Sequence, residues 1–228
     1  MRLLRALLLA LLAGMPAAAD DRPGMLPAEG HAAWQAIGRL NAAGYDRRRL
    51  CTATLIAPDE VLSAAHCVRQ AGGRPVRMQD LRFVAGWFRG ERAAVARISA
   101  VAVAPTWTGG QGGRGPLGDD VAILTLSAPL SIAPLPLAPP RAGEPVRILG
   151  YRADRPHALS DSGTCPHGRA AEGTRATPCQ ATFGTSGAPV LQDRDGTWHV
   201  VGVVSAIGGG QTYFAPWRAE HRDTLNSQ

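Results

Sequence analysis

Phe183-Gly184-Thr185-Ser186-Gly187-Ala188-Pro189-Val190 is the stretch that most restricts the fold of this sequence. It places a serine between two glycines and follows it with a small residue, a proline and an apolar run. A glycine before the serine permits backbone dihedral angles that other residues avoid, so a backbone N–H can point into a cavity. Gly-x-Ser-Gly turns also occur in ordinary β-hairpins. The stretch alone therefore leaves a nucleophile turn and a plain hairpin open.

A histidine ends a second distinctive stretch, which runs from Cys51 to Cys67 as CTATLIAPDEVLSAAHC. Its pattern is a strand, a turn and a second strand that ends at His66. A disulfide between the two cysteines would fix the backbone that carries the imidazole. A catalytic base needs such fixing, because small misplacements are costly. A half-buried structural histidine is the alternative for His66 seen alone.

A pair of aspartates opens a third stretch, Asp119-Asp120-Val-Ala-Ile-Leu-Thr-Leu. An acidic residue directly before an apolar strand is expected to be partly buried, because the neighbouring residues of the strand are buried. A buried carboxylate is costly unless it is hydrogen-bonded, and a histidine N–H is a natural partner. Asp120 is adjacent to the strand and is the better candidate, whereas we expect Asp119 to be exposed.

Short apolar strands fill the chain from His31 onward. They are rich in Val, Ile, Leu and aromatic residues and are broken by Gly, Pro and Asp, which is typical of an all-β barrel or sandwich protein. The strands are expected at 34–40, 50–56, 81–88, 95–103, 121–126, 146–151, 187–192 and 199–205. Helical periodicity is confined to a turn at 63–68 and the tail 217–225.

The first 19 residues are expected to be a cleaved signal peptide, outside the fold. Arg2 and Arg5 form a positive region, residues 6–12 form an apolar core too short to span a bilayer, and three alanines precede Asp20. Residues 20–30 are predicted to be an extended leader or pro-segment. The sequence therefore predicts a secreted or periplasmic protein, with no membrane insertion after signal cleavage.

Charge argues against a nucleic-acid partner. All 24 basic residues are arginine, they face 18 acidic residues, and no basic stripe is interleaved with aromatic residues. The remaining histidines are expected to be surface residues: His157, His167, His199 and His221.

Four cysteines in an exported chain suggest two disulfides, for which three connectivities exist. The spacing favours Cys51–Cys67 and Cys165–Cys179, because each pair encloses a compact, hairpin-sized segment. Metal ligation is the alternative, but the sequence contains no Cys-x-x-Cys or His-x-x-x-His spacing. We therefore expect no metal and no cofactor.

Together the three stretches resemble the trypsin-like (chymotrypsin-fold) serine peptidases. The matching segments are Ser63-Ala-Ala-His66-Cys67, Asp120-Val-Ala-Ile-Leu and Gly184-Thr-Ser186-Gly-Ala-Pro. Their order of histidine, aspartate and serine is that of this family and differs from the order in subtilisins and α/β-hydrolases. Including weaker matches, the resemblance covers about residues 34 to 217.

The resemblance implies a fold of two six-stranded antiparallel β-barrels, with the active site in the cleft between them and a short C-terminal helix. The peptidase domain would span 31–228, with the first barrel at about 31–130, a linker at about 131–141 and the second barrel at about 142–228. The histidine and the aspartate would lie on the first barrel and the serine on the second. A monomer is expected.

The resemblance also implies a chemistry for protein or peptide substrates. Ser186 would attack the carbonyl carbon while His66 takes its proton and Asp120 orients the imidazole. The N–H groups of Gly184 and Ser186 would form the oxyanion hole. Two alternatives remain: a catalytically silent binding protein with the trypsin fold, and an esterase on the same scaffold.

One position departs from the digestive and clotting branch of this family. There an aspartate precedes the nucleophile and pairs with a newly cut N-terminus, but this sequence has Thr185. No cleavage site before Ile-Val-Gly-Gly is present either. The oxyanion hole must therefore be ordered in another way. Residues 179–189 look more like the secreted bacterial branch that includes the glutamyl endopeptidases.

Substrate specificity follows less directly from the resemblance. Aligned on the nucleophile, the pocket wall would include Ala181, Thr182 and Ser205 as substrate-binding residues. Residues 178–183 contain no carboxylate that could select Arg or Lys. Glutamyl preference in the similar branch uses a histidine and a wall hydroxyl, whereas this chain has Val204 and Ala181 at those places. We therefore expect a small or apolar residue at the substrate position P1.

Overall fold

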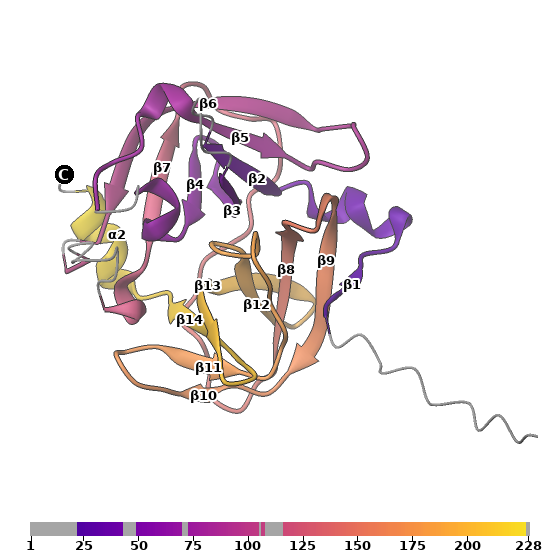
Figure 1. The fold of residues 1–228 in the computed structure, drawn as a ribbon, viewed down its shortest axis with the longest axis vertical. Coiled ribbons are helices and arrows are strands. Elements are labelled where there is room, and N and C mark those ends of the chain that lie inside the picture. Colours follow the sequence, from indigo (N-terminus) through magenta and orange to yellow (C-terminus); the bar gives the residue numbers. More distant parts are fainter. Residues whose placement is uncertain (1–21, 43–48, 70–72, 105, 108–115, 227–228) are drawn as a thin grey trace, which may run out of the picture.

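The computed structural model describes residues 22–42, 49–69, 73–104, 106–107 and 116–226. It contains two β-structures arranged side by side, with the C-terminal helix α2 (Ala219–Asn226) packed beside the first (Figure 1). The predicted signal peptide at residues 1–19 lies outside the described residues. None of the helices in the described part of the chain is long and apolar enough to cross a bilayer.

The first half forms a closed six-stranded barrel, as the family resemblance implies. Its strands pair in the order β2-β3-β4-β7-β6-β5, and all the pairs are antiparallel. The strands are β2 (Ile37–Ala42), β3 (Arg49–Ala57), β4 (Glu60–Ser63), β5 (Leu81–Ala85), β6 (Ala94–Val103) and β7 (Ala122–Leu126). Leu55, Phe83 and Leu124 are fully buried inside the barrel.

The second half differs in detail from a six-stranded barrel, because it is an eight-stranded antiparallel sheet in the order β1-β9-β8-β12-β13-β14-β11-β10. Six of these strands take the place of the second barrel that the resemblance implies, and the sequence prediction located three of the six, at 146–151, 187–192 and 199–205. Among the described residues, β9 and β11 do not pair with each other, since each pairs with an additional edge strand instead. The strands are β1 (Gly24–Met25), β8 (Val146–Arg152), β9 (Arg155–Cys165), β10 (Gly168–Arg169), β11 (Arg175–Thr177), β12 (Pro189–Arg194), β13 (Thr197–Gly208) and β14 (Gln211–Pro216).

Several expected element bounds shift in the structure. The segment expected to begin a strand at Trp34 is instead the end of a 3₁₀-helix over Ala28–Trp34, and the strand begins at Ile37. The remaining 3₁₀-helices are Ala65–Val68, Met78–Asp80 and Leu117–Asp119. The sequence prediction missed β9 and β14. Each forms a hairpin with the strand that precedes it, β8 and β13 respectively, and each also pairs on its other edge with a strand that is distant in the sequence, β1 and β11 respectively.

A shared apolar core joins the two halves. It takes Ile37 and Leu62 from the barrel and Leu149 and Leu191 from the second sheet, and all four are fully buried. Strand side chains alternate between the two faces, so a barrel strand can supply both the barrel interior and this interface. At about 25 cal/mol for each Å² of apolar surface removed from water, such burial keeps the two halves in a defined relative position.

The N-terminal segment is docked onto the second sheet. Strand β1 pairs with β9, with Gly24 opposite Asp161. Leu26 is buried in the shared core, and the buried His31 has Nδ1 3.0 Å from the Pro27 carbonyl oxygen. Residues 22–30, expected to be an extended leader or pro-segment, therefore pack against the body of the protein (Figure 1).

Both predicted disulfides are present. Cys51–Cys67 joins β3 to the 3₁₀-helix that follows β4, and Cys165–Cys179 joins the end of β9 to the segment before the serine turn. The sequence separations are 16 and 14 residues. Loops of this size are worth about 3 kcal/mol each in the chain-entropy model. The disulfides thus brace the two segments that carry His66 and Ser186.

Candidate active site

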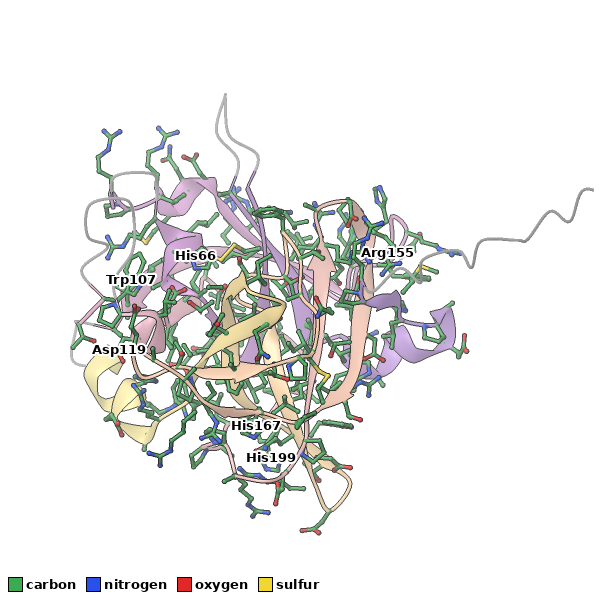
Figure 2. The ribbon with its side chains drawn as sticks, turned by 60° about the horizontal axis from the view of Figure 1, so that its bottom comes forward. His66, Trp107, Asp119, Arg155, His167 and His199 are labelled. Atoms are coloured by element: carbon green, nitrogen blue, oxygen red, sulfur yellow. A yellow bond between two sulfur atoms is a disulfide. The ribbon has the colours of Figure 1, made fainter. Side chains whose placement is uncertain are left out.

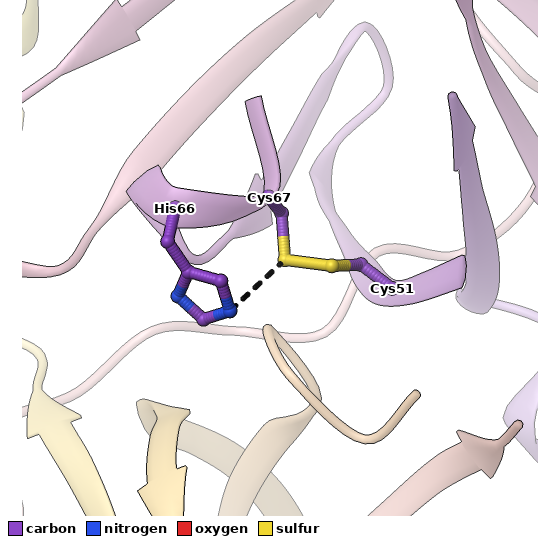
Figure 3. A group of neighbouring side chains, drawn as sticks. All are labelled: Cys51, His66 and Cys67. Atoms are coloured by element: carbon purple, nitrogen blue, oxygen red, sulfur yellow. Dashed lines mark hydrogen bonds between the residues drawn. A yellow bond between two sulfur atoms is a disulfide. The ribbon is translucent and has the colours of Figure 1, made fainter. Parts of the chain in front are cut away.

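His66 lies on the short 3₁₀-helix that directly follows β4. Its imidazole is beside the Cys51–Cys67 disulfide, with Nε2 3.8 Å from Cys67 Sγ (Figure 3). Three possible metal-ligating atoms from Cys51, His66 and Cys67 lie within 4.8 Å of one another. Both sulfur atoms are used in the disulfide, so they cannot act as thiolate ligands. This group is therefore a braced histidine and does not fit a metal site.

Asp120 pairs with this histidine. Its Oδ2 lies 2.7 Å from His66 Nδ1, and its Oδ1 accepts a hydrogen bond from the His66 backbone N–H at 2.9 Å. The Asp120 side chain is only 2% exposed, so it needs these donors. The carboxylate favours the tautomer with hydrogen on Nδ1, which leaves Nε2 free to accept a proton.

Ser205 supplies a further donor to Asp120. The sequence places Ser205 on the wall of the substrate pocket, but its hydroxyl donates to Asp120 Oδ2 at 2.6 Å and is buried. The Ser205 hydroxyl therefore supports the carboxylate of Asp120. Sequence reasoning missed this role, because β13 approaches Asp120 only in the folded protein.

The serine turn packs against the segment that leads to His66. Gly187 has a φ of 76°, and a Cβ at this position would overlap the Ser63 hydroxyl and the Thr52 carbonyl. The carbonyl of Ser186 accepts a hydrogen bond from Thr52 N–H at 2.9 Å. Only glycine fits this close approach, which brings the half-buried Ser186 from the second sheet to the edge of the first barrel.

Thr52 supports the site through hydrogen bonds, and the sequence prediction did not select it. It is fully buried, and its Oγ1 accepts the Tyr151 N–H at 3.0 Å and donates to the Gly184 carbonyl at 3.1 Å. One hydroxyl therefore links β3, β8 and the serine turn. The only sequence signal was a hydroxyl residue in the apolar run after Cys51.

The peptide between Phe183 and Gly184 has a fixed orientation. Gly184 has a φ of 96°, and the Phe183 carbonyl accepts the Ala153 N–H at 2.7 Å. In a trans peptide the N–H points opposite to the carbonyl, so the Gly184 N–H points away from Ala153. Within the described residues, neither this N–H nor that of Ser186 donates to a protein acceptor. Both donors are available to a bound group.

Thr185 stabilises the same turn. Its N–H donates to the Thr182 carbonyl at 3.0 Å, and its Oγ1 accepts the Thr182 N–H at 3.3 Å. Thr185 is buried and holds the turn with local hydrogen bonds. Of the other predicted pocket residues, Ala181 is buried and Thr182 is half-buried, and the following Phe183 is 81% exposed.

The sequence predicts an exposed Asp119, but this prediction is wrong. It is half-buried and accepts hydrogen bonds from Thr106 Oγ1 at 2.6 Å and Arg218 Nη1 at 2.8 Å. Burial by itself raises the pKa of Asp119, but these hydrogen bonds and the Arg218 charge lower it below its usual value overall. Figure 2 shows Asp119 beside the C-terminal helix. This aspartate anchors the helix.

His221 corrects a second surface prediction. It lies on α2 and is buried, with its ring 5.6 Å from that of Trp217. Burial lowers the pKa of His221, and the nearby Arg218 charge lowers it further. A cavity of about 510 Å³ lies between this helix and the β10–β11 hairpin, and none of the candidate catalytic residues lines it.

Comparison with solved structures identifies the fold. The chain matches a thermostable serine protease, AL20, from an extremophilic microorganism with a TM-score of 0.72 at 20% identity, covering 86% of this chain and 97% of that one. It matches the protease Anisep from Arthrobacter nicotinovorans with a TM-score of 0.71 at 18% identity over 85% and 95% of the two chains. A Glu endopeptidase gives a TM-score of 0.71 at 18% identity over 92% and 97%.

Sequence comparison agrees with the fold. Neutrophil elastase from Mus musculus is 44% identical over 85 residues, which span 36% of this chain and 31% of that protein. These solved structures and this relative are proteases, and the fold of the chain is that of the chymotrypsin-like serine proteases. The family model for the trypsin-like peptidase domain matches residues 51–203, and the chain belongs to this family.

Proposed function

We propose that the protein is a secreted or periplasmic serine endopeptidase with the catalytic residues His66, Asp120 and Ser186. The observation that carries this proposal is the 2.7 Å contact between the buried Asp120 carboxylate and His66 Nδ1, opposite a glycine-flanked serine turn. Each of the three residues comes from a different segment, and the segments are braced by a disulfide or by hydrogen bonds.

In the proposed reaction, Ser186 Oγ attacks the carbonyl carbon of the substrate while its proton moves to His66 Nε2. Asp120 stabilises the imidazolium through the Nδ1–H bond. The negative charge on the former carbonyl oxygen is received by the N–H groups of Gly184 and Ser186. The proton then passes from His66 to the leaving amine, and water releases the acyl group by the same steps.

The proposed specificity is for a small or apolar P1 residue. The buried Ala181 and the half-buried Thr182 offer no charge to a substrate side chain. Two large apolar side chains, Phe183 and Ile207, are 81% and 45% exposed on the two segments that would flank the pocket. Exposed apolar side chains beside a reactive centre favour apolar substrate residues.

Export is the proposed location, because two disulfides form and persist in oxidising compartments. Neither a metal nor another cofactor enters the proposed reaction. We also propose that the protein acts as a monomer on protein or peptide substrates.

Labelling with a fluorophosphonate probe tests this proposal. We expect the mature protein to be labelled and the Ser186→Ala and His66→Ala variants not to be labelled. Folded wild-type protein that resists labelling would instead favour the silent binding-protein alternative. Turnover of a p-nitrophenyl ester without any cleavage of a peptide library would favour the esterase alternative.

A further inference from the structure

The oxyanion turn rests on the chain at residues 151–153. A Cβ on Gly184 would lie 2.6 Å from the Ala153 nitrogen and 3.0 Å from the Arg152 carbonyl carbon, so the two backbones are in close contact. The Ala153 N–H holds the Phe183 carbonyl at 2.7 Å. The direction of the Gly184 N–H therefore depends on where Ala153 is held.

The side chain of Arg152 holds this segment in place. Its guanidinium is 5% exposed and donates to Asp154 through Nε at 2.9 Å and Nη2 at 2.6 Å. The third donor, Nη1, reaches the Pro23 carbonyl oxygen at 2.7 Å. A buried guanidinium without such acceptors is unstable, so the loop and the N-terminal segment are joined through this one side chain.

The Pro23 carbonyl is itself fixed by tertiary structure. It directly precedes β1, which pairs with β9, and Leu26 N–H then donates to Leu159 at 2.9 Å. Arg155 Nη2 donates to the same Pro23 oxygen at 2.7 Å.

We propose that Arg152 is a positioning residue for the oxyanion hole, and that the N-terminal strand β1 is part of the active enzyme because it holds Arg152. This inference rests on the proposed function. Contacts run from Pro23 through Arg152 and Ala153 to the peptide that precedes Gly184. Thr185 cannot form an ion pair with an N-terminal amine, and this hydrogen-bonded chain of contacts orders the turn instead.

Replacing Arg152 tests the proposal. In Arg152→Met the Ala153 N–H loses its support, and the Phe183–Gly184 peptide no longer has one fixed orientation. Loss of one oxyanion donor lowers kcat by about 10²- to 10³-fold, so partial disorder is expected to slow fluorophosphonate labelling by about 10- to 100-fold. For p-nitrophenyl acetate we expect kcat to fall and KM to change by less than about threefold. Arg152→Lys, which can still donate to Pro23, is expected to recover part of the rate.

Arg147→Met is the matched control. Arg147 lies on the same strand, is partly buried, bonds Asp161 through Nε at 2.9 Å and stacks over Trp34 and Trp198. It does not contact the serine turn. Its loss is expected to lower the thermal midpoint without slowing labelling at temperatures well below that midpoint.

Equal labelling rates for wild type and folded Arg152→Met would overturn the proposal, as would equal slowing in Arg147→Met. If Arg152→Met does not fold, Asp154→Asn replaces it, because the exposed Asp154 side chain accepts hydrogen bonds from the guanidinium groups of Arg152 and Arg22. A labelling rate unchanged in Asp154→Asn would then overturn the proposal. Wild-type protein that is not labelled would refute the proposed function, and with it the role of Arg152, whereas the outcomes above would refute only the role of Arg152.

Discussion

Replacing Thr52 with valine removes one hydroxyl and nearly keeps the shape of the side chain. In the structure this hydroxyl accepts the Tyr151 N–H and donates to the Gly184 carbonyl, and all three groups are buried. Valine would leave one donor and one acceptor without partners inside the protein. Water cannot reach the groups to replace the lost bonds.

The expected cost follows from these two groups. An unsatisfied buried polar group costs about 1–3 kcal/mol, so Thr52→Val is expected to lower the free energy of unfolding by about 2–6 kcal/mol. A domain is typically stable by about 5–15 kcal/mol, so a folded variant with a lower urea midpoint is expected. Thr52→Ser keeps both hydrogen bonds and loses one methyl group, with an expected cost of about 1 kcal/mol.

Thr54 offers a control two residues further along the same strand. It is also fully buried, but its Oγ1 has no hydrogen-bond partner among the described residues. Thr54→Val is therefore expected to leave the urea midpoint unchanged or to raise it. The variants are compared by tryptophan fluorescence in urea and by fluorophosphonate labelling. Thr52→Val with a stability equal to that of wild type or of Thr54→Val would refute the reasoning.

Two further predictions concern the aspartates. Ser205→Ala removes a hydrogen bond to the Asp120 carboxylate, and hydrogen bonds to charged groups are worth about 1.5–3 kcal/mol. Fluorophosphonate labelling is therefore expected to slow by about 10-fold or more. An unchanged labelling rate would exclude this supporting role for Ser205. Asp119 has a folded-state pKa below its ordinary 3.8, so its contribution to stability is present above pH 3.8 and is lost as the pH falls through the lower folded value. Asp119→Asn, which no longer attracts Arg218, is expected to unfold at lower urea than wild type at pH 7, and the difference between the two midpoints is expected to narrow below pH 3.8. A difference that is the same at both pH values would contradict the assignment.

The candidate catalytic residues could be found in the sequence, because their signals are local. A histidine beside a cysteine after a strand pair, an aspartate before an apolar strand and a serine between glycines each occupy a short stretch. The structure brings His66 and Asp120 together and confirms both disulfides. The regular spacing of the apolar strands predicted an all-β barrel or sandwich, and the resemblance to the trypsin-like peptidases implied the closed six-stranded first barrel.

Other elements depended on partners that are distant in the sequence. Strand β9 is polar and contains glycine; it forms a hairpin with the adjacent β8, but its other edge pairs with β1, more than 130 residues earlier in the chain. His221 looked like a surface residue of the tail, but the helix packs it against the body of the protein. The local sequence pattern carries no information about such pairings, because the stabilising free energy comes from burial of side chains against the partner strand or the body of the protein.

By itself, therefore, the sequence determined the types of the candidate catalytic residues, their order along the chain and the cysteine pairs. Only the tertiary structure decided which residues support them. Thr52 donates a hydrogen bond to the Gly184 carbonyl in the serine turn, Ser205 donates to Asp120, and the Pro23 carbonyl accepts from Arg152. The physical reason is that a supporting hydrogen bond needs only one donor and one acceptor. Almost any polar residue can provide them, so only the folded chain shows which one does.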